Sequence, residues 1–354
     1  MQSEETSRCI LNLHFNQTNV KLKQSTLAIG TTKGFKVLNV EDGQVLINRD
    51  DDQKFLGGFS IIRPVFSTPL YCFVGSASNP RYPLNTVYFW DDRLSQSIAE
   101  IHFRSEVKNV LIRRDRAVVV LPTLTYVYML NSLKAFSCIE ICENEKGAAA
   151  ISFDKDIFVL LSLSTEPGTI RMENYSNEEI KVAQIHENPI YIVAVDFIGS
   201  VGASASEQGT IIRVFDCSTL EVLHELRRGT SPAQISSISF SPQSNMLVVS
   251  SNKSTIHVWK LEKPKAKGMF SKYLPGYFQF TRSIGKLNLK SEIEWTCPFT
   301  EDLGPKAVFQ NDSELLVACL DGNLHKCFID TQTSKILVKD TKVFFDINTG
   351  SILL

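Results

Sequence analysis

Residues 247–259 read Leu-Val-Val-Ser-Ser-Asn-Lys-Ser-Thr-Ile-His-Val-Trp, which is two runs of strand-forming residues on either side of a polar turn. Val, Ile and Trp favour β-strands, whereas Asn and Ser favour the turns that join them. The stretch therefore predicts a β-hairpin. Helical periodicity is nearly absent from the rest of the chain, and short β-branched and aromatic runs recur between turn residues, so we expect an all-β protein.

The second half of this hairpin belongs to a pattern that returns seven times, a small or polar turn followed by an alternating strand. The apolar runs of the copies begin at Phe35, Val87, Tyr126, Ile170, Ile211, Ile256 and Leu324. The steps between them are 52, 39, 44, 41, 45 and 68 residues, and four of these steps match the 40–45 residues or so of a propeller blade. Insertions at 75–83 and 263–290 account for the two long steps.

The repeats predict a single seven-bladed β-propeller with WD40-like four-stranded blades over residues 7–346, with short tails at 1–6 and 347–354. The pairs Trp90-Asp91 and Phe215-Asp216 resemble the WD ending of propeller repeats. The pattern leaves open how the ring closes between the first strand, near Cys9, and the last strands, near Val343.

The overall composition indicates a soluble globular protein with no global electrostatic field. The 354 residues are 43% hydrophobic, and 37 basic residues against 38 acidic ones give a net charge of −1, so binding to a polyanion requires a local basic patch. The start of the chain does not resemble a secretion signal, and no apolar run is long enough to span a membrane. Eight scattered cysteines indicate reduced thiols in a cytosolic protein, and their spacing predicts no metal site.

The insertion at 263–290 differs in composition from the rest of the chain. It contains seven Lys or Arg residues and no Asp or Glu. Apolar side chains alternate with these charges, at Met269, Phe270, Tyr273, Leu274, Tyr277 and Phe278. Cations beside exposed aromatic rings suit the interface of an anionic bilayer, so we expect a membrane-facing loop. A basic linker, or a loop that packs its rings onto the propeller, remains an alternative.

Two adjacent arginines, Arg227 and Arg228, lie between the fifth and sixth copies of the repeat. Neighbours in an extended chain point to opposite sides, so the two guanidinium groups can serve two separate anion sites. The alternative is a solvated charge pair at a turn. Hydroxyl and imidazole groups, which suit a phosphorylated inositol, occur on both sides of the pair, although small hydroxyl residues also satisfy backbone groups at tight turns.

Three stretches carry a resemblance to a known family. They are Leu-Arg-Arg-Gly at 226–229, Ser-Pro-x-Gln-Ile-Ser-Ser-Ile-Ser-Phe-Ser-Pro at 231–242 and Val-Ser-Ser-Asn-Lys-Ser-Thr-Ile-His-Val-Trp at 249–259. Together with the repeats, they resemble the PROPPIN family of phosphoinositide-binding β-propellers, which includes the WIPI proteins of autophagy. The resemblance implies two pockets for phosphatidylinositol 3-phosphate and 3,5-bisphosphate and a long loop of the sixth blade that inserts into the bilayer.

The resemblance also assigns residues to the two pockets. The first pocket would contain Arg227, His186, Ser204, Ser206, Thr210 and Arg213. The second would contain Arg228, Ser251, Thr255 and His257. Leu226 stands where the family motif most often has Phe, and we expect it to pack in the same way. The Leu form resembles the WIPI branch that works with the large autophagy lipid-transfer protein.

The expected function is that of a peripheral membrane effector that binds 3-phosphorylated phosphoinositides and recruits autophagy machinery. The protein would be a cytoplasmic monomer associated with preautophagosomal, endosomal or vacuolar membranes, without a cofactor and without nucleic acid. The acidic clusters at 50–52 and 91–92 lack a partner base or metal set, so we expect no enzyme activity. The alternative is a WD-repeat scaffold that binds only proteins. A further hypothesis is that protonation of His186 or His257 strengthens phosphate binding at mildly acidic pH.

Overall fold

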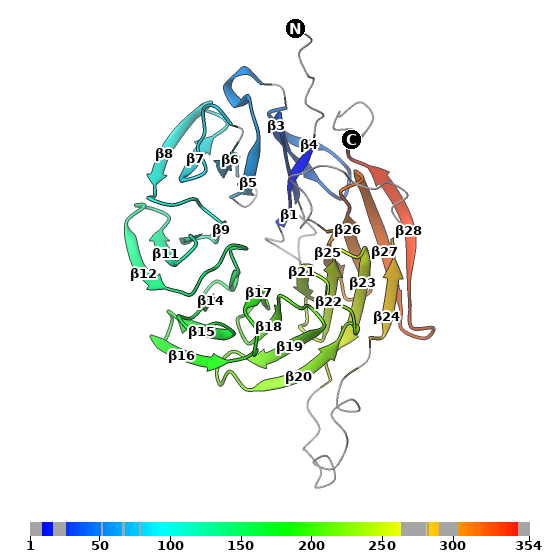
Figure 1. Ribbon diagram of the computed structural model, residues 1–354. Helices are drawn as coiled ribbons and strands as arrows, with labels where there is room; N and C mark the ends of the chain where they lie inside the picture. The colour runs from blue at the N-terminus through cyan, green and yellow to red at the C-terminus, as the bar shows by residue number, and fades with distance from the viewer. Residues whose placement is uncertain are drawn as a thin grey trace.

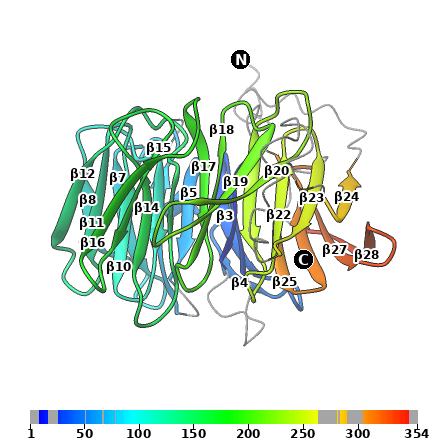
Figure 2. The same ribbon diagram turned by 90° about the horizontal axis from the view of Figure 1, so that it is seen from below.

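Seven antiparallel sheets of four strands each surround a central axis in the computed structural model (Figure 1). The structure describes residues 9–16, 26–50, 52–65, 68–77, 79–262, 281, 283–289 and 304–345. Each sheet consists of four strands that are consecutive in sequence, and each strand pairs with the next. The first strand of each sheet is the innermost, and the side view shows the sheets standing side by side around the ring (Figure 2).

The strands of the seven blades have the following bounds. Blade 1 contains β1 (Ile10–Asn16), β2 (Thr26–Thr31), β3 (Gly34–Asn39) and β4 (Val45–Asn48). Blade 2 follows a short 3-10 helix, η2 (Gln53–Phe55), and contains β5 (Phe59–Pro64), β6 (Leu70–Gly75), β7 (Thr86–Asp91) and β8 (Gln96–His102). Blade 3 contains β9 (Asn109–Ile112), β10 (Arg116–Val120), β11 (Leu124–Met129) and β12 (Ala135–Glu140). Blade 4 contains β13 (Ala149–Ile151), β14 (Val159–Leu163), β15 (Thr169–Asn174) and β16 (Glu179–Gln184).

The remaining three blades complete the ring. Blade 5 contains β17 (Ile190–Val195), β18 (Val201–Ser206), β19 (Ile211–Asp216) and β20 (Val222–Arg227). Blade 6 contains β21 (Ile235–Phe240), β22 (Met246–Ser251), β23 (Thr255–Lys260) and β24 (Gly285–Asn288). Blade 7 contains β25 (Lys306–Asn311), β26 (Glu314–Ala318), β27 (Asn323–Asp330) and β28 (Lys335–Val343).

The seven copies of the sequence pattern correspond to one position in the blade. They fall on β3, β7, β11, β15, β19, β23 and β27, the third strand of each sheet. The prediction of an all-β, seven-bladed propeller is therefore confirmed. The aspartates of the WD-like endings have a local role, because the Asp91 and Asp216 carboxylates accept backbone N–H bonds from the turns that follow β7 and β19. These bonds stabilise the hairpin to the fourth strand.

The structure changes the bounds of one predicted insertion. Residues 76–85 connect β6 to β7, as expected, but residues 285–288 of the predicted loop 263–290 form β24, the outer strand of blade 6. The alternation of buried Gly285 and half-buried Leu287 with exposed Lys286 and Asn288 is the pattern of an edge strand. A strand of four residues is too short to stand out from a basic, aromatic stretch.

Between the described ends of the chain, residues 9 and 345, the ring closes by packing and each terminal blade keeps its own strands. Blade 1 is built entirely from N-terminal strands and blade 7 entirely from C-terminal strands, and the two blades lie next to each other (Figure 1). Ile10 and Leu13 of β1 share one apolar cluster with Leu316 and with Phe344 and Phe345, which follow β28. Phe344 and Phe345 are both at most 1% exposed. Burial of these rings stabilises the contact between blades 1 and 7, which in a shared sheet would be stabilised by hydrogen bonds between strands.

Among the described residues, no helix has the length and apolar character needed to cross a bilayer. The seven cysteines in the described part of the chain are free thiols, and four of them are buried: Cys72, Cys217, Cys319 and Cys327.

Candidate anion-binding site

The arginine pair lies where blades 5 and 6 meet. Arg227 is the last residue of β20 and pairs with Ile211 of β19, while the backbone N–H of Arg228 donates to the Thr210 carbonyl at 2.9 Å. Leu226 is fully buried in the apolar cluster between the two blades, which also contains Trp259. The packing role predicted for Leu226 is thus confirmed. The pair is held at a fixed place on the rim by the side chain that precedes it.

The Arg228 side chain also donates hydrogen bonds to the neighbouring backbone. Its Nε donates to the Gly209 carbonyl at 2.9 Å and its Nη2 donates to the Ser231 carbonyl. Gly209 has a φ of +58°, and a Cβ there would lie 1.9 Å from the Ala233 carbonyl oxygen, so this turn requires glycine. A guanidinium group has five N–H donors, so these two bonds leave capacity for a phosphate.

The blade 5 cluster consists of His186, Ser204 and Arg213. The imidazole Nε2 of His186 lies 2.9 Å from the Ser204 hydroxyl, and both residues are buried. Arg213 pairs with Ser204 across strands β18 and β19, and it donates to the Glu225 carboxylate and the Ile185 carbonyl, both at 2.7 Å. The structure thus brings together three residues that sequence reasoning assigned to the first pocket. The Glu225 carboxylate offsets part of the Arg213 charge, and this ion pair was not predicted from the sequence.

The other residues assigned to the first pocket surround this cluster less directly. Ser206 ends β18 and accepts the Gly209 N–H through its carbonyl, while Thr210 accepts the Arg228 N–H through its own. Arg227 is half-buried at the end of β20. For Ser206 and Thr210, the backbone bonds support the structural role that small hydroxyl residues have at turns.

The blade 6 cluster consists of Ser251, Thr255 and His257. The Ser251 and Thr255 hydroxyls lie 2.8 Å apart and belong to paired positions of β22 and β23. His257 is 4% exposed and stacks on Trp259, with ring centroids 5.4 Å apart. Its Nδ1 is buried without a hydrogen-bond partner among the described residues. Three of the four residues assigned to the second pocket therefore lie on neighbouring strands, and one of them, His257, retains an unsatisfied polar atom.

The pKa of each of the two histidines is affected by the charge of a different arginine. Burial and the nearby charge of Arg213 lower the pKa of His186 to about 4. Burial and the charges of Lys286 and Arg228 lower the pKa of His257 to about 4. Both rings are therefore neutral between pH 6 and 8 in the free protein. In the free protein, burial beside cations disfavours the imidazolium, so the lowered pKa values count against the hypothesis that protonation of these rings strengthens binding at mildly acidic pH.

Acid is expected to destabilise the fold partly through these rings. A histidine of the unfolded chain has a pKa of about 6.5, so between pH 6.5 and 4 the unfolded state binds more protons than the folded state. The stability that a neutral ring provides is complete above about pH 6.5 and is lost as the pH falls. In urea denaturation, His257→Asn should reduce the loss of unfolding free energy between pH 7 and 5 by about 1–2 kcal/mol. An unchanged loss would show that His257 is not held neutral.

Two further residues at this site, besides Glu225, were not predicted from the sequence. Lys286 of β24 pairs with His257 of β23, so its ammonium group adds a cation to the blade 6 cluster. Thr281 bridges to Leu226 of β20, and its carbonyl accepts the Trp259 indole N–H at 3.3 Å. The alternation of small or apolar residues with polar ones at 285–288 was the sequence signal that could have placed Lys286 on a strand of blade 6. Nothing in the sequence pointed to Thr281, because its partners are about 20 and 55 residues away.

Lys286 should contribute modestly to headgroup binding. Lys286→Ser is expected to weaken binding of soluble inositol 1,3-bisphosphate about two- to fivefold, because an exposed cation contributes about 0.5–1 kcal/mol and is screened by salt. Isothermal titration calorimetry at low and physiological salt measures the effect. Lys260→Ser, at the other end of blade 6, is the matched control. Equal effects of the two changes would remove Lys286 from the site.

The predicted membrane-insertion residues Met269, Phe270, Tyr273, Leu274, Tyr277 and Phe278 lie outside the described residues. The described chain leaves blade 6 at Glu262 and returns at Thr281 beside β20. The chain between them, residues 263–280, is called the basic aromatic segment below. It is therefore attached at the junction of blades 5 and 6, which carries the arginine pair.

The fold and the site define a seven-bladed propeller with two polar clusters on either side of an arginine pair at the edge of the blades. The PROPPIN family model matches residues 12–279. The chain belongs to the PROPPIN family of phosphoinositide-binding propellers, as the resemblance predicted.

Curated relatives agree with this assignment over most of the chain. Autophagy-related protein 18e of Arabidopsis thaliana is 29% identical over 93% of this chain and 88% of its own length. SVP1-like protein 2 of Pichia angusta is 31% identical over 71% of this chain and 70% of its own. Autophagy-related protein 18 of Dictyostelium discoideum is 31% identical over 72% of this chain and 65% of its own.

Solved structures share the fold. Hsv2 of Kluyveromyces lactis superimposes with a TM-score of 0.72 at 20% identity, covering 96% of this chain and 100% of that one. KlAtg21, in its complex with the coiled coil of AgAtg16, superimposes with a TM-score of 0.75 at 19% identity, covering 95% and 99%.

Proposed function

We propose that the protein binds phosphatidylinositol 3-phosphate and phosphatidylinositol 3,5-bisphosphate through two pockets that flank Arg227 and Arg228. The observation that carries the proposal is the separation of the polar groups into two clusters, each with its own arginine. Arg213 acts on His186 in blade 5, and Arg228 acts on His257 in blade 6. Each cluster combines a guanidinium group with a neutral imidazole and hydroxyls, which together can donate several hydrogen bonds to phosphate oxygens.

The basic aromatic segment supplies the second half of the membrane interaction. Its C-terminal end, at Thr281, is attached beside Leu226 and Trp259, so its side chains and the two pockets can contact the same bilayer. Two weak headgroup contacts and an inserted loop on one rigid body act with a high effective concentration, which gives firm and reversible binding. The protein is then a peripheral membrane effector at preautophagosomal, endosomal or vacuolar membranes.

Recruitment of autophagy proteins completes the proposed function. The names of the relatives and the coiled-coil complex of KlAtg21 support a role in autophagosome assembly. Partners of this chain would include autophagy proteins, with the large autophagy lipid-transfer protein as one candidate. A protein-only scaffold is the alternative, and it requires no lipid binding at all.

A liposome panel separates these two functions. We expect flotation with liposomes that contain either 3-phosphorylated lipid and little flotation with unphosphorylated phosphatidylinositol or with phosphatidylinositol 4-phosphate. Flotation that is the same for all four lipids would contradict the proposed specificity, and no flotation with any of them would favour the scaffold.

A further inference from the structure

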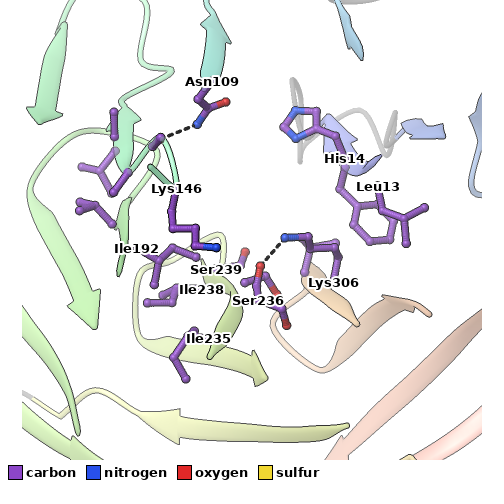
Figure 3. Close-up of a pocket in the computed structure, with 18 of the residues that line it drawn as sticks. Leu13, His14, Asn109, Lys146, Ile192, Ile235, Ser236, Ile238, Ser239 and Lys306 are labelled. Carbon is purple, nitrogen blue, oxygen red and sulfur yellow. Dashed lines mark hydrogen bonds between the residues drawn. The ribbon is translucent and has the colours of Figure 1, made fainter. Parts of the chain in front are cut away.

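The axis of the propeller contains a cavity whose lining differs from the residues of the rim clusters. It has a volume of about 560 Å³ and is lined by the inner strands, including β1, β5, β21 and β25. Figure 3 shows His14, Asn109, Lys146 and Lys306 pointing into the same opening from different blades. None of the residues of the blade 5 or blade 6 cluster lines this cavity. We call it the axial channel.

Positive charge dominates the lining of the axial channel. Among the residues that the structure describes, the charged ones that line it are Arg63, Lys108, Lys146 and Lys306, against the single carboxylate of Asp196. Lys108 is neutralised by ion pairs with glutamates that lie outside the lining, Glu106 and Glu145. The Asp196 carboxylate is occupied by the hydroxyls of Ser200 and Ser244. Around the described part of the cavity, the cations thus outnumber the carboxylates.

Arg63 and Lys306 are two cations of the channel wall that donate hydrogen bonds to neutral acceptors. Arg63 donates to the carbonyls of Val110 and Ile62 and to the Asn109 amide oxygen at 2.9, 3.0 and 3.1 Å. The Lys306 ammonium donates to the Ser236 carbonyl. Within the described part of the chain, neither forms an ion pair with a carboxylate. A buried and a half-buried cation thus have only neutral acceptors among the described residues, which is costly unless an anion joins them.

The effects of these cations on each other show that they share one space. Burial and the Arg63 charge lower the pKa of Lys306 to about 8. Burial, followed by the charges of Arg63 and Lys306, lowers the pKa of His14 well below its usual value. An anion between them would reverse the sign of these interactions, because each cation would then face an opposite charge.

We propose that the axial channel binds a compact phosphate-bearing anion from solution, with Arg63 and Lys306 as its charged contacts. Arg63 donates four of its five N–H groups to neutral acceptors, so its remaining N–H and its charge, together with the point charge of Lys306, are what a phosphate oxygen would meet. A cavity of this size lies within the usual range for small-molecule sites. Cations that converge on one axis from several blades favour a compact, multiply charged group over an extended acidic peptide. This site is separate from the rim clusters, so it does not depend on the proposed lipid binding.

The test uses the full chain with Arg227 and Arg228 both replaced by Thr, so that the rim clusters do not contribute. Inorganic pyrophosphate is the probe, with sodium chloride at matched ionic strength as the reference. We expect pyrophosphate to raise the midpoint of thermal unfolding and to give a calorimetric binding isotherm. Lys306→Met should weaken this binding about tenfold or more, the effect of losing a hydrogen bond to a charged group. Lys335→Met, on exposed β28 of the same blade, should leave it unchanged.

A second variant covers the case in which Lys306→Met does not fold. Lys146 is exposed at the channel mouth, so Lys146→Met should fold and weaken pyrophosphate binding severalfold. The proposal is overturned if pyrophosphate stabilises no more than chloride, or if the channel variants and Lys335→Met bind it equally. Binding of a hexaglutamate peptide without binding of pyrophosphate would also overturn it, by assigning the channel to an acidic peptide.

Discussion

Replacing Arg227 and Arg228 together by Thr should lower the affinity for liposomes that contain phosphatidylinositol 3-phosphate by about 100-fold or more. Each guanidinium group is expected to make charge-assisted hydrogen bonds to a phosphate, and each such bond contributes about 1.5–3 kcal/mol. The two losses multiply, because both pockets act on one membrane from one rigid body. Liposome flotation across a range of lipid concentrations measures the change. The single changes should each remove only part of the affinity.

The control variant for this experiment must lose the same two positive charges at another place on the surface. Arg104 and Arg114 are exposed arginines of the β8–β9 and β9–β10 connections, distant in sequence from the pair, and replacing both by Thr removes the same two charges. We expect this control to bind like the wild type. Since Arg228 also holds the Gly209 and Ser231 carbonyls, thermal unfolding of each variant should accompany the binding data. Undiminished flotation of a folded Arg227→Thr, Arg228→Thr protein would refute the two-pocket proposal.

The second large effect is expected from the basic aromatic segment. Replacing Phe270, Tyr273 and Phe278 by Ser should weaken bilayer binding about 100-fold, since it removes three apolar rings and leaves every charge in place. Burying one large apolar side chain contributes about 1.5–3 kcal/mol, and rings at a membrane interface are only partly buried. Binding of soluble inositol 1,3-bisphosphate should be unchanged, because that ligand contacts the rim clusters alone.

A matched control removes three exposed apolar side chains from elsewhere on the propeller. Leu94, Ile98 and Ile180, near the outer edges of blades 2 and 4, are 60%, 49% and 54% exposed, and replacing them by Ser should leave bilayer binding intact. If the segment variant loses soluble headgroup binding and liposome binding to the same degree, the segment supports the fold of the rim. That result would contradict its proposed insertion into the bilayer.

The repeats and the arginine pair were predictable because both depend on local order in the chain. Alternation along a strand and polar turns between strands are properties of neighbouring residues, so the seven copies could be counted without coordinates. The opposite directions of Arg227 and Arg228 follow from the same geometry. The missed contacts involve residues far apart in sequence: Glu225 with Arg213, Lys286 with His257, and Thr281 with Trp259.

The amino-acid sequence by itself determined the seven-bladed architecture, the family and the position of the arginine pair between the fifth and sixth repeats. Only the tertiary structure decided that His186 and His257 are neutral, that Phe344 and Phe345 close the ring, and that Arg63 and Lys306 share one axial channel. The physical reason is the range of the interactions. Strand periodicity acts between neighbours in the chain, whereas burial and electrostatic interactions depend on which distant side chains the closed ring brings together.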